Sequence, residues 1–502
     1  MRARPANLSC DHGLTCARPP ASIMRFHSET MTTIPENPSA PRPGPLADPL
    51  TDHPRPAAID AGFFGHPRGL STLFFTEMWE RFSYYGMRAF LILYMVHVLG
   101  FDDRRAGSVY GTYTASVWAA AIFGGIIADR WLGQYKSVLY GGIIIALGHF
   151  TLAFHPLPFF YTGLGLIVIG TGLLKPNVSG IVGSLYETND ARRDAGFSIF
   201  YMGINLGAAL GPFIAGYLAQ RVDWHLGFAC AGVGMTFGLI QYVMGRKRLQ
   251  PAVERLERQR REARATAAER ARGAATSSST EPTFWGFTNV EWKRLGAMGI
   301  FFVLAAVFWG AYEQAGSTLN LFGDRFTRTS IMGFSFPSSW FLTIQAIFVI
   351  VLSPMFAWLW TRLGNREPST PAKFAFGLFF IGLSFVFLLI PAFQLQDSPG
   401  IRVSPFWLIG CYFIQELGEL SLSPVGLTVF TKLSPVKIVG FMLGVWFLAD
   451  SVGNKAAGFA AGFISSAPLP HLFGAVAAVC LGASLVAFMI IKPVRGLMGG
   501  VH

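Results

Sequence analysis

Long apolar segments recur along the chain between residues 71 and 491, and they constrain its fold more than any other feature. Each is near the length of about 20 residues that a helix needs to cross a bilayer. Only 14% of the 502 residues are charged, whereas an average soluble domain has about 25%. The sequence therefore predicts an all-α polytopic membrane protein. The twelve expected spans are 71–98, 105–128, 137–155, 159–185, 195–219, 226–246, 293–318, 338–363, 372–392, 403–431, 437–465 and 470–491.

The basic residues indicate how the chain is oriented. Between Arg246 and Arg272 there are ten Arg or Lys and four Glu, which supply six of the net charges of +12. Because a basic stretch between apolar segments is typical of a cytoplasmic loop, we favour this interpretation over nucleic-acid binding. When the spans are counted from a cytoplasmic N-terminus, the inner loops carry most of the other Arg and Lys. We therefore expect a plasma (inner) membrane protein with both termini in the cytoplasm.

The long linker divides the spans into six and six, which is the layout of two transporter halves. Pro251 and Gly273 are suited to begin and end a helix, so the linker is either a polar helix or a simple tether. The expected parts are a disordered cytoplasmic tail at 1–68, a first six-helix bundle at 69–246, a basic cytoplasmic linker at 247–292, a second six-helix bundle at 293–491 and a cytoplasmic tail at 492–502.

The first span holds the densest set of charges, in the segment TEMWERFSYYGMR. At about 100° per residue, its polar side chains fall on one side of the helix. A charge at the bilayer centre costs between about 2.5 and more than 10 kcal/mol, so such residues usually face a water-filled cavity. A salt-bridge ladder along the helix is the alternative, but it gains only tenths of a kcal/mol per pair. This polar face comprises Glu77, Glu80, Arg81, Tyr84, Tyr85 and Arg88.

Several other spans carry charged or amide side chains within an apolar context, in two cases with a Tyr or Trp on the same helix. Acids occur in both halves and bases in the first half, which suits a cavity for a zwitterionic solute and carboxylates that carry protons. These residues are Lys175 in the fourth span, Tyr201 and Asn205 in the fifth, Glu313 and Gln314 in the seventh, Glu416 and Glu419 in the tenth, and Trp446, Asp450 and Asn454 in the eleventh.

Four segments carry a resemblance to a known family. The segment from Glu77 to Gly86 resembles the ExxER motif of the proton-dependent oligopeptide transporter (POT/PTR) family, within the major facilitator superfamily. AIFGGIIADRWLG, with Asp129 and Arg130, resembles the superfamily's loop motif. FYMGINLGAALGP resembles the FYxxINxG signature, and ELSLSPVGL resembles the tenth-helix motif. The resemblance covers residues 70 to 490 and implies the major facilitator fold, with twelve transmembrane helices in two six-helix bundles.

The resemblance also implies a function, the import of di- and tripeptides together with protons by alternating access. Protons are then the coupling ion, and no cofactor and no metal are expected. The residues expected to couple protonation to binding are Glu77, Glu80 and Arg81. Those expected to bind the peptide are Arg81, Tyr85 and Lys175 at its carboxylate, Asn205 and Glu419 at its amino terminus, and Tyr84, Gln345, Ser423 and Trp446 along the rest of the site.

Two charge pairs are expected to act as gates. The resemblance implies that Arg88 and Glu313 form an outer gate between the halves. It also implies that Lys175 pairs with Glu419 when the site holds no substrate. Each pair takes one residue from each half of the chain, so either would couple the movement of one bundle to the other.

The chain departs from the family pattern at four places. Many members have a His on the second helix, where this chain has Tyr110 followed by Gly111. An aromatic position further along that helix, often Tyr, is Trp118, and a frequent Asn on the eighth helix is Gln345. Many bacterial members also insert two further helices between the halves. Residues 247–292 are too polar for such an insertion, so we expect twelve spans rather than fourteen.

Three alternatives remain open on the sequence. The first is a symporter of the same family for another small anionic or zwitterionic solute, such as an amino acid or nitrate. The second is a membrane enzyme, although His97, His149 and His155 lie in no ligand-spaced or nucleophile-base cluster. The third is a channel, for which no ring-forming repeat is visible. The paired Glu of the first span, with Glu419, favours a peptide, because its amino terminus needs an acidic partner.

Overall fold

The computed structural model describes residues 62–187, 190–274, 286–435 and 438–499. Most of the predicted tail at 1–68 and part of the linker therefore lie outside the described residues. The described chain is almost entirely helical, with one short hairpin of β1 (Ser330–Ile331) and β2 (Phe334–Ser335). Helices satisfy their own backbone hydrogen bonds, which is what an apolar membrane environment requires of a spanning segment.

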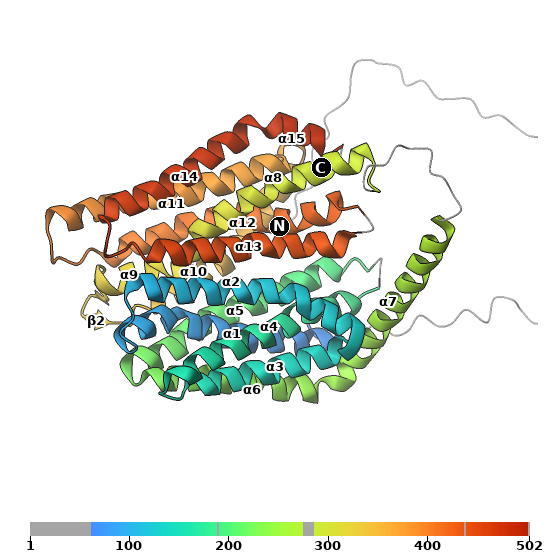
Figure 1. Cartoon of the computed structure of the whole chain (residues 1–502), viewed down its shortest axis with the longest axis horizontal. Coiled ribbons are helices and arrows are strands. Elements are labelled where there is room, and N and C mark those ends of the chain that lie inside the picture. Colours follow the sequence, from blue (N-terminus) through green and yellow to red (C-terminus); the bar gives the residue numbers. More distant parts are fainter. Residues whose placement is uncertain (1–61, 188–189, 275–285, 436–437, 500–502) are drawn as a thin grey trace, which may run out of the picture. The chain divides into compact units, whose positions relative to one another are not determined.

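The first half of the chain forms a bundle of six long helices (Figure 1). Short polar caps set some of their starts, since the Asp102 carboxylate accepts a hydrogen bond from the Arg105 amide at 2.7 Å. Within the bundle α1 packs on α5 and α6, and α4 packs on α2 and α3. The helices are α1 (Arg68–His97), α2 (Asp103–Ile127), α3 (Gln134–Leu152), α4 (Leu157–Ser184), α5 (Arg193–Arg221) and α6 (Trp224–Met244).

The second half forms a bundle of the same kind, with two short helices added. The predicted seventh span continues from α8 through a 3-10 turn into α9, so it runs further than predicted. In this bundle α11 packs on α12 and α14, and α13 packs on α8. The helices are α8 (Asn289–Tyr312), α9 (Thr318–Arg325), α10 (Trp340–Leu363), α11 (Thr370–Asp397), α12 (Pro405–Leu433), α13 (Val439–Ala461), α14 (Leu469–Met489) and α15 (Ile491–Leu497).

The long helices are apolar enough for a membrane. In the described part of the chain, eight helical stretches have the length and composition of spans, including α2, α4, α5 and α6 of the first half. Helix α1 is not among them because of the Glu and Arg side chains in its middle. These helices confirm the predicted all-α polytopic fold.

The halves meet along two helix pairs, α2 with α13 and α5 with α10. The first pair is closely packed at glycine positions. A Cβ built on Gly107 would lie 2.3 Å from the Gly458 carbonyl oxygen, and one on Gly111 would lie 2.9 Å from the Gly458 Cα. Because neither position has room for a side chain, glycine is what lets α2 and α13 approach.

The predicted linker contains a long polar helix, α7 (Arg246–Ala274). Its first turns rest on the first bundle, where Leu249 and Ala252 are buried in a cluster with residues of α1 and α4. The Arg255 guanidinium donates a 3.2 Å hydrogen bond to the Ser184 carbonyl at the end of α4. Figure 1 shows α7 beside this bundle. Of the two interpretations of the linker, the structure therefore favours a helix lying on the bundle.

Candidate functional site

The charged residues of α1 form one buried cluster. The Arg81 guanidinium donates to both carboxylate oxygens of Glu80, with Nη2 to Oε1 at 2.5 Å, and its Nε lies 3.4 Å from Glu77 Oε1. All three side chains are 3% exposed or less. Tyr84 and Tyr85 flank the guanidinium, with ring centroids 5.2 and 5.8 Å from Arg81 Cζ. One arginine between two carboxylates leaves a net negative charge that a proton can cancel.

Small residues let this helix lie close to α5. A Cβ on Gly207 would lie 2.2 Å from the Met78 carbonyl oxygen, and one on Gly86 would lie 3.1 Å from Gly211. Small residues at a helix contact are typical of membrane bundles. Asn205, two residues before Gly207, lines the same cavity as Tyr85 and Arg88, and its amide donates to the Tyr201 carbonyl at 3.0 Å.

Arg88 connects the two halves. Its guanidinium forms an ion pair with Glu313, at the end of α8, and donates a 2.5 Å hydrogen bond from Nε to the Tyr110 hydroxyl on α2. Both members of the ion pair are buried. The structure thus brings together the two residues predicted for the outer gate. Their alternation between states stays a prediction.

A small cavity of about 80 Å³ lies between these groups. It extends from α1 and α5 of the first half to α10 and the α8 end of the second half. Five polar residues that were singled out from the sequence line this cavity. They are Tyr85, Arg88, Asn205, Glu313 and Gln345, and Tyr312 joins them.

The second half contributes two carboxylates from α12. Glu416 accepts a 2.9 Å hydrogen bond from the Tyr312 hydroxyl. Glu419 is 6% exposed, and its Oε2 has no hydrogen-bond partner among the described residues. On α13, Asp450 accepts a 2.7 Å hydrogen bond from the Asn454 amide. A buried carboxylate oxygen that lacks a partner is costly, which makes Glu419 available to a cationic ligand.

Lys175 differs from the sequence prediction. No ion pair joins it to Glu419 in the described part of the chain; instead its Nζ lies 3.2 Å from the centroid of the Trp118 ring. Helix α4 directs the lysine toward α2 of its own bundle, because α2 and α4 are packed neighbours, whereas Glu419 lies in the other half. The Lys175–Glu419 pair therefore stays a prediction for another arrangement of the two halves.

The remaining predicted ligands are spread around the site. Tyr84 is buried, and its hydroxyl has no partner among the described residues. Trp446 is buried against Phe430, with ring centroids 5.3 Å apart, and Ser423 is half-buried on α12. Trp446 thus packs in the apolar core of the second half, and its part in a side-chain pocket stays a prediction. Ser423 follows Glu419 by one helical turn and so lies on the same face of α12.

The superfamily loop motif lies at the opposite end of α2 from Gly107. Asp129 pairs with Arg260 of α7 and accepts a 3.1 Å hydrogen bond from the Gln134 amide, while Arg130 is exposed. The last residue of this motif, Gly133, has a φ of 73°, a left-handed conformation that favours glycine. The contact between Asp129 and the linker helix was not predicted, because sequence periodicity does not say where a polar helix docks.

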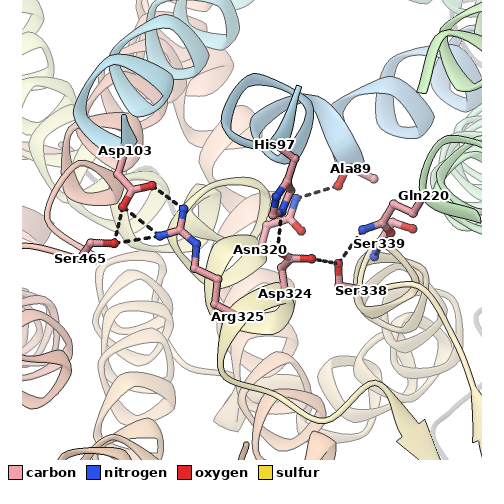
Figure 2. Close-up of polar contacts among 10 residues, drawn as sticks. All are labelled: Ala89, His97, Asp103, Gln220, Asn320, Asp324, Arg325, Ser338, Ser339 and Ser465. Carbon is pink, nitrogen blue, oxygen red and sulfur yellow. Dashed lines mark hydrogen bonds and ion pairs between the residues drawn. The ribbon is translucent and has the colours of Figure 1, made fainter. Parts of the chain in front are cut away.

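Figure 2 shows a second polar network, at the end of the bundles that carries α9. The Arg325 guanidinium donates to both carboxylate oxygens of Asp103, at 2.6 and 2.9 Å, and so joins α9 to α2. His97 Nε2 lies 2.8 Å from Asp324 Oδ2, and the Asn320 amide donates to the Ala89 carbonyl at 2.7 Å. These contacts cross between the halves, so we call this region the closed α9 end.

Sequence reasoning missed the closed α9 end and Tyr312. The residues from Thr318 to Arg325 continue a predicted span, but nothing in their pattern says that they contact the other half. Tyr312 directly precedes Glu313. Its position next to this predicted gate residue was the one sequence feature that could have indicated its place at the site. Tyr110 was noted only for lacking a following His, although its hydroxyl contacts the Arg88 guanidinium.

Comparison with known proteins places these features in context. The sequence model of the POT family matches residues 135–257 and 288–479. An uncharacterised transporter, YclF of Bacillus subtilis, is 40% identical, with 88% of this chain and 96% of that protein covered. A di-/tripeptide transporter of Lactococcus lactis subsp. cremoris is 36% identical, with 88% of this chain and 98% of that protein covered.

Solved structures agree with these matches. A crystal structure of the peptide transporter POT in complex with sulfate has a TM-score of 0.78 and 38% identity, and covers 88% of this chain and 97% of that one. A crystal structure of a POT family transporter in complex with 5-aminolevulinic acid has a TM-score of 0.75 and 30% identity, and covers 87% of this chain and 98% of that one.

Proposed function

This chain belongs to the POT family, and on that premise we propose that it is a proton-coupled symporter that imports di- and tripeptides by alternating access. The observation that carries the proposal is the distribution of buried charge across the site. Arg81 is buried and Lys175 half-buried in helices of the first half, and Glu416 and Glu419 are buried in α12 of the second half. A peptide with one carboxylate and one ammonium group complements such a site.

The two ends of the peptide would be held by different halves. Its carboxylate would accept hydrogen bonds from Arg81, Tyr85 and Lys175, because charged donors to a carboxylate are the strongest hydrogen bonds available. Its ammonium group would donate to Glu419 and to the Asn205 amide oxygen. Between these ends, side chains would lie against the remaining predicted ligands, Tyr84, Gln345, Ser423 and Trp446.

Protons would act through the α1 cluster. Arg81 forms ion pairs with Glu77 and Glu80. A substrate carboxylate that binds Arg81 competes for those contacts, and the carboxylate it releases would take up a proton. Uptake of the anionic end of the peptide and of the proton are then linked. Protons are the coupling ion in this scheme, and we propose no cofactor.

Alternating access would open one end of the bundles at a time. In this structure the Arg88–Glu313 ion pair and the contacts of the closed α9 end join the halves. We propose that this end faces outward, that the termini and α7 lie in the cytoplasm, and that the protein resides in the plasma (inner) membrane. The basic side chains of α7 support this orientation, since cytoplasmic segments are enriched in Arg and Lys.

One alternative substrate class has a specific observation in its favour. A POT family transporter that is 30% identical to this chain was crystallised with 5-aminolevulinic acid, a zwitterion with a spacing between charges like that of a dipeptide. Another small zwitterionic or anionic solute, such as an amino acid or nitrate, is therefore the second candidate. A membrane enzyme is not favoured, because the family is one of transporters.

Uptake into proteoliposomes separates these candidates. We expect labelled dialanine to accumulate against its gradient when the outside is acidic, and to lose accumulation when a protonophore is added. Unlabelled trialanine should compete with dialanine, whereas free alanine, 5-aminolevulinic acid and nitrate should compete weakly. Competition by alanine or 5-aminolevulinic acid as strong as that by trialanine would instead support the second candidate.

A further inference from the structure

We propose that Trp118 is a positioning residue for Lys175: its ring holds the lysine ammonium beside the site as an unneutralised cation, and so favours ligands with a free carboxylate. The proposal rests on the proposed function, because it assigns Lys175 to the carboxylate end of the substrate. It concerns a residue at which this chain departs from the aromatic type frequent in its family.

The contact between the two residues is close. Lys175 Nζ lies 3.2 Å from the centroid of the Trp118 ring, well within the roughly 6 Å over which a cation is attracted to an aromatic face. Neither a hydrogen bond nor an ion pair of Lys175 is found in the described part of the chain, so the ring is the partner that its ammonium contacts there. Among aromatic side chains, Trp has the most favourable face for a cation.

A second aromatic ring fixes the tryptophan in place. Trp118 stacks on Phe447 of α13, with ring centroids 5.9 Å apart and an interplanar angle of 16°. Since α13 belongs to the second half, the support for the Trp118 ring comes from across the contact between the bundles. Lys175 on α4 thus contacts Trp118 on α2, which in turn stacks on Phe447 on α13.

The nature of this partner matters for binding. A carboxylate partner would neutralise Lys175 and occupy its donors, so a substrate carboxylate would first have to displace it. An aromatic face stabilises the ammonium without accepting its charge, and the three N–H donors remain available to an anion. The charge of Arg81 repels the ammonium of Lys175, and three acids that form no ion pair with it attract it, namely Glu77, Glu80 and Asp450. Without the ring, the attraction of these carboxylates would draw the Lys175 ammonium toward one of them.

The indole N–H adds a second possible contact. Trp118 Nε1 is buried and has no hydrogen-bond partner in the described part of the chain. An unpaired buried donor is costly, and it lies on the same side chain that holds the cation. A ligand carboxylate at Lys175 would therefore find another donor close by. A simple space-filling role for Trp118 explains neither the position of Nζ over the ring nor this donor.

The test compares ligands that differ only in their carboxylate. Dialanine and dialanine amide would compete with labelled dialanine in counterflow, which needs no proton gradient, for wild type, Trp118→Leu, Trp118→Met and Trp118→Phe. A desolvated cation–π contact corresponds to roughly a 5- to 30-fold change in affinity. We therefore expect Trp118→Leu and Trp118→Met to lower the affinity for dialanine about 5- to 30-fold. The same variants should change the affinity for dialanine amide by less than about twofold. Trp118→Phe, which keeps an aromatic face, should fall between these variants and wild type.

A matched control is available on α10. Trp360 also lies against a lysine, with Lys373 Nζ 4.6 Å from its ring centroid. This lysine already forms an ion pair with Glu367, and neither Trp360 nor Lys373 is assigned to the substrate site. Trp360→Leu should change the affinities for dialanine and for dialanine amide by the same factor. If the Leu variant is not recovered folded from detergent, the Met and Phe variants carry the comparison.

Two outcomes would overturn the proposal. One is an equal loss for dialanine and its amide in the Leu and Met variants, as expected if the ring only fills space. The other is a Phe variant as poor as Leu for dialanine alone, which would assign the effect to the indole N–H. Failure of the proposed function looks different, because wild type would then show no exchange of labelled dialanine at all.

Discussion

The Arg88 guanidinium of α1 and the Glu313 carboxylate at the end of α8 form a buried ion pair between the two halves of the chain. A third group from α2, the Tyr110 hydroxyl, accepts a 2.5 Å hydrogen bond from Arg88. Breaking a buried pair by removing one partner costs about 3–5 kcal/mol, because the other charge is left uncompensated. The halves therefore cannot separate here unless water or another partner reaches both groups.

Exchanging the two charges tests whether this pair acts as a gate. Arg88→Glu places two carboxylates together, and Glu313→Arg places two guanidiniums together. We expect each single variant to lower dialanine transport at least about tenfold, in line with the cost of unpaired buried charge. The double variant should transport more than either single variant, because the attraction is restored. The measurement is proton-driven uptake, corrected for the amount of folded protein in the liposomes.

The hydrogen bond from Arg88 to Tyr110 is lost in the double variant, so partial recovery is the expected result. Tyr110→Phe serves as the control for that bond alone. A double variant no better than the worse single one would mean that the pairing has no part in transport.

Glu80→Gln tests the proposed proton coupling. The substitution keeps the shape of the side chain but removes the charge that contacts Arg81. A glutamine cannot be protonated and released in a cycle, so we expect accumulation driven by a proton gradient to be lost. Counterflow of dialanine should persist in part, because exchange needs binding and movement but no net proton transfer.

Glu262→Gln, at an exposed position of α7, is the control for removing an acid without touching the site. Proton-driven accumulation and counterflow of dialanine should both be the same in this variant as in wild type. Uphill accumulation by Glu80→Gln at the wild-type level would remove Glu80 from the coupling scheme.

The ammonium end of the substrate leads to a prediction for Glu419. Its Oε2 is buried and has no partner among the described residues, which is the state expected of an acid that receives a cationic group. A hydrogen bond to a charged group contributes about 1.5–3 kcal/mol, so Glu419→Gln should weaken dialanine by roughly 10- to 100-fold.

A blocked ligand separates this effect from a structural one. N-acetyl-dialanine has no ammonium group, so its weak competition should change little in the Glu419→Gln variant. If both ligands lose affinity by the same factor, Glu419 supports the fold of α12 and not the ammonium end of the substrate.

Sequence periodicity was enough to predict the helices and the α1 cluster. Glu77, Glu80 and Arg81 lie on one face of one helix, and a helix fixes that relation without help from the rest of the fold. Residues that contact each other across helices are harder to predict. The Arg88–Glu313 pair followed from the family resemblance, whereas periodicity alone places each residue on a face and says nothing of its partner.

The position of Lys175 shows the limit most directly. Sequence alone identifies a costly buried charge in α4, but several acids and aromatic rings lie within reach of a long, flexible side chain. Which of them it contacts depends on how α2 and α4 are packed. The contacts of the closed α9 end were missed for a similar reason, since they join α9 to α1 and α2 through residues more than 200 positions apart.

The close approach of α2 and α13 leads to the last prediction. A Cβ on Gly111 would lie 2.9 Å from the Gly458 Cα and 3.1 Å from the Asn454 carbonyl oxygen. Backbone atoms cannot move aside as a flexible side chain can, so Gly111→Ala should force the two helices apart. Overpacking of this kind costs about 1–3 kcal/mol, which corresponds to roughly a 5- to 100-fold shift in a two-state equilibrium. The arrangement with the α9 end closed should lose population by that factor.

Spin labels at the ends of these helices measure the shift. Arg105 on α2 and Ser466, just after α13, are exposed at the α9 end, and pulsed electron resonance between labels at these positions reports their separation. We expect Gly111→Ala to move the distance distribution to longer values and to slow counterflow. Gly125→Ala on the same helix is the control, because its Cβ would have only the Pro176 Cβ within reach, at 4.0 Å. An unchanged distribution in the Gly111→Ala protein would show that the α2–α13 contact tolerates a side chain and does not limit closure.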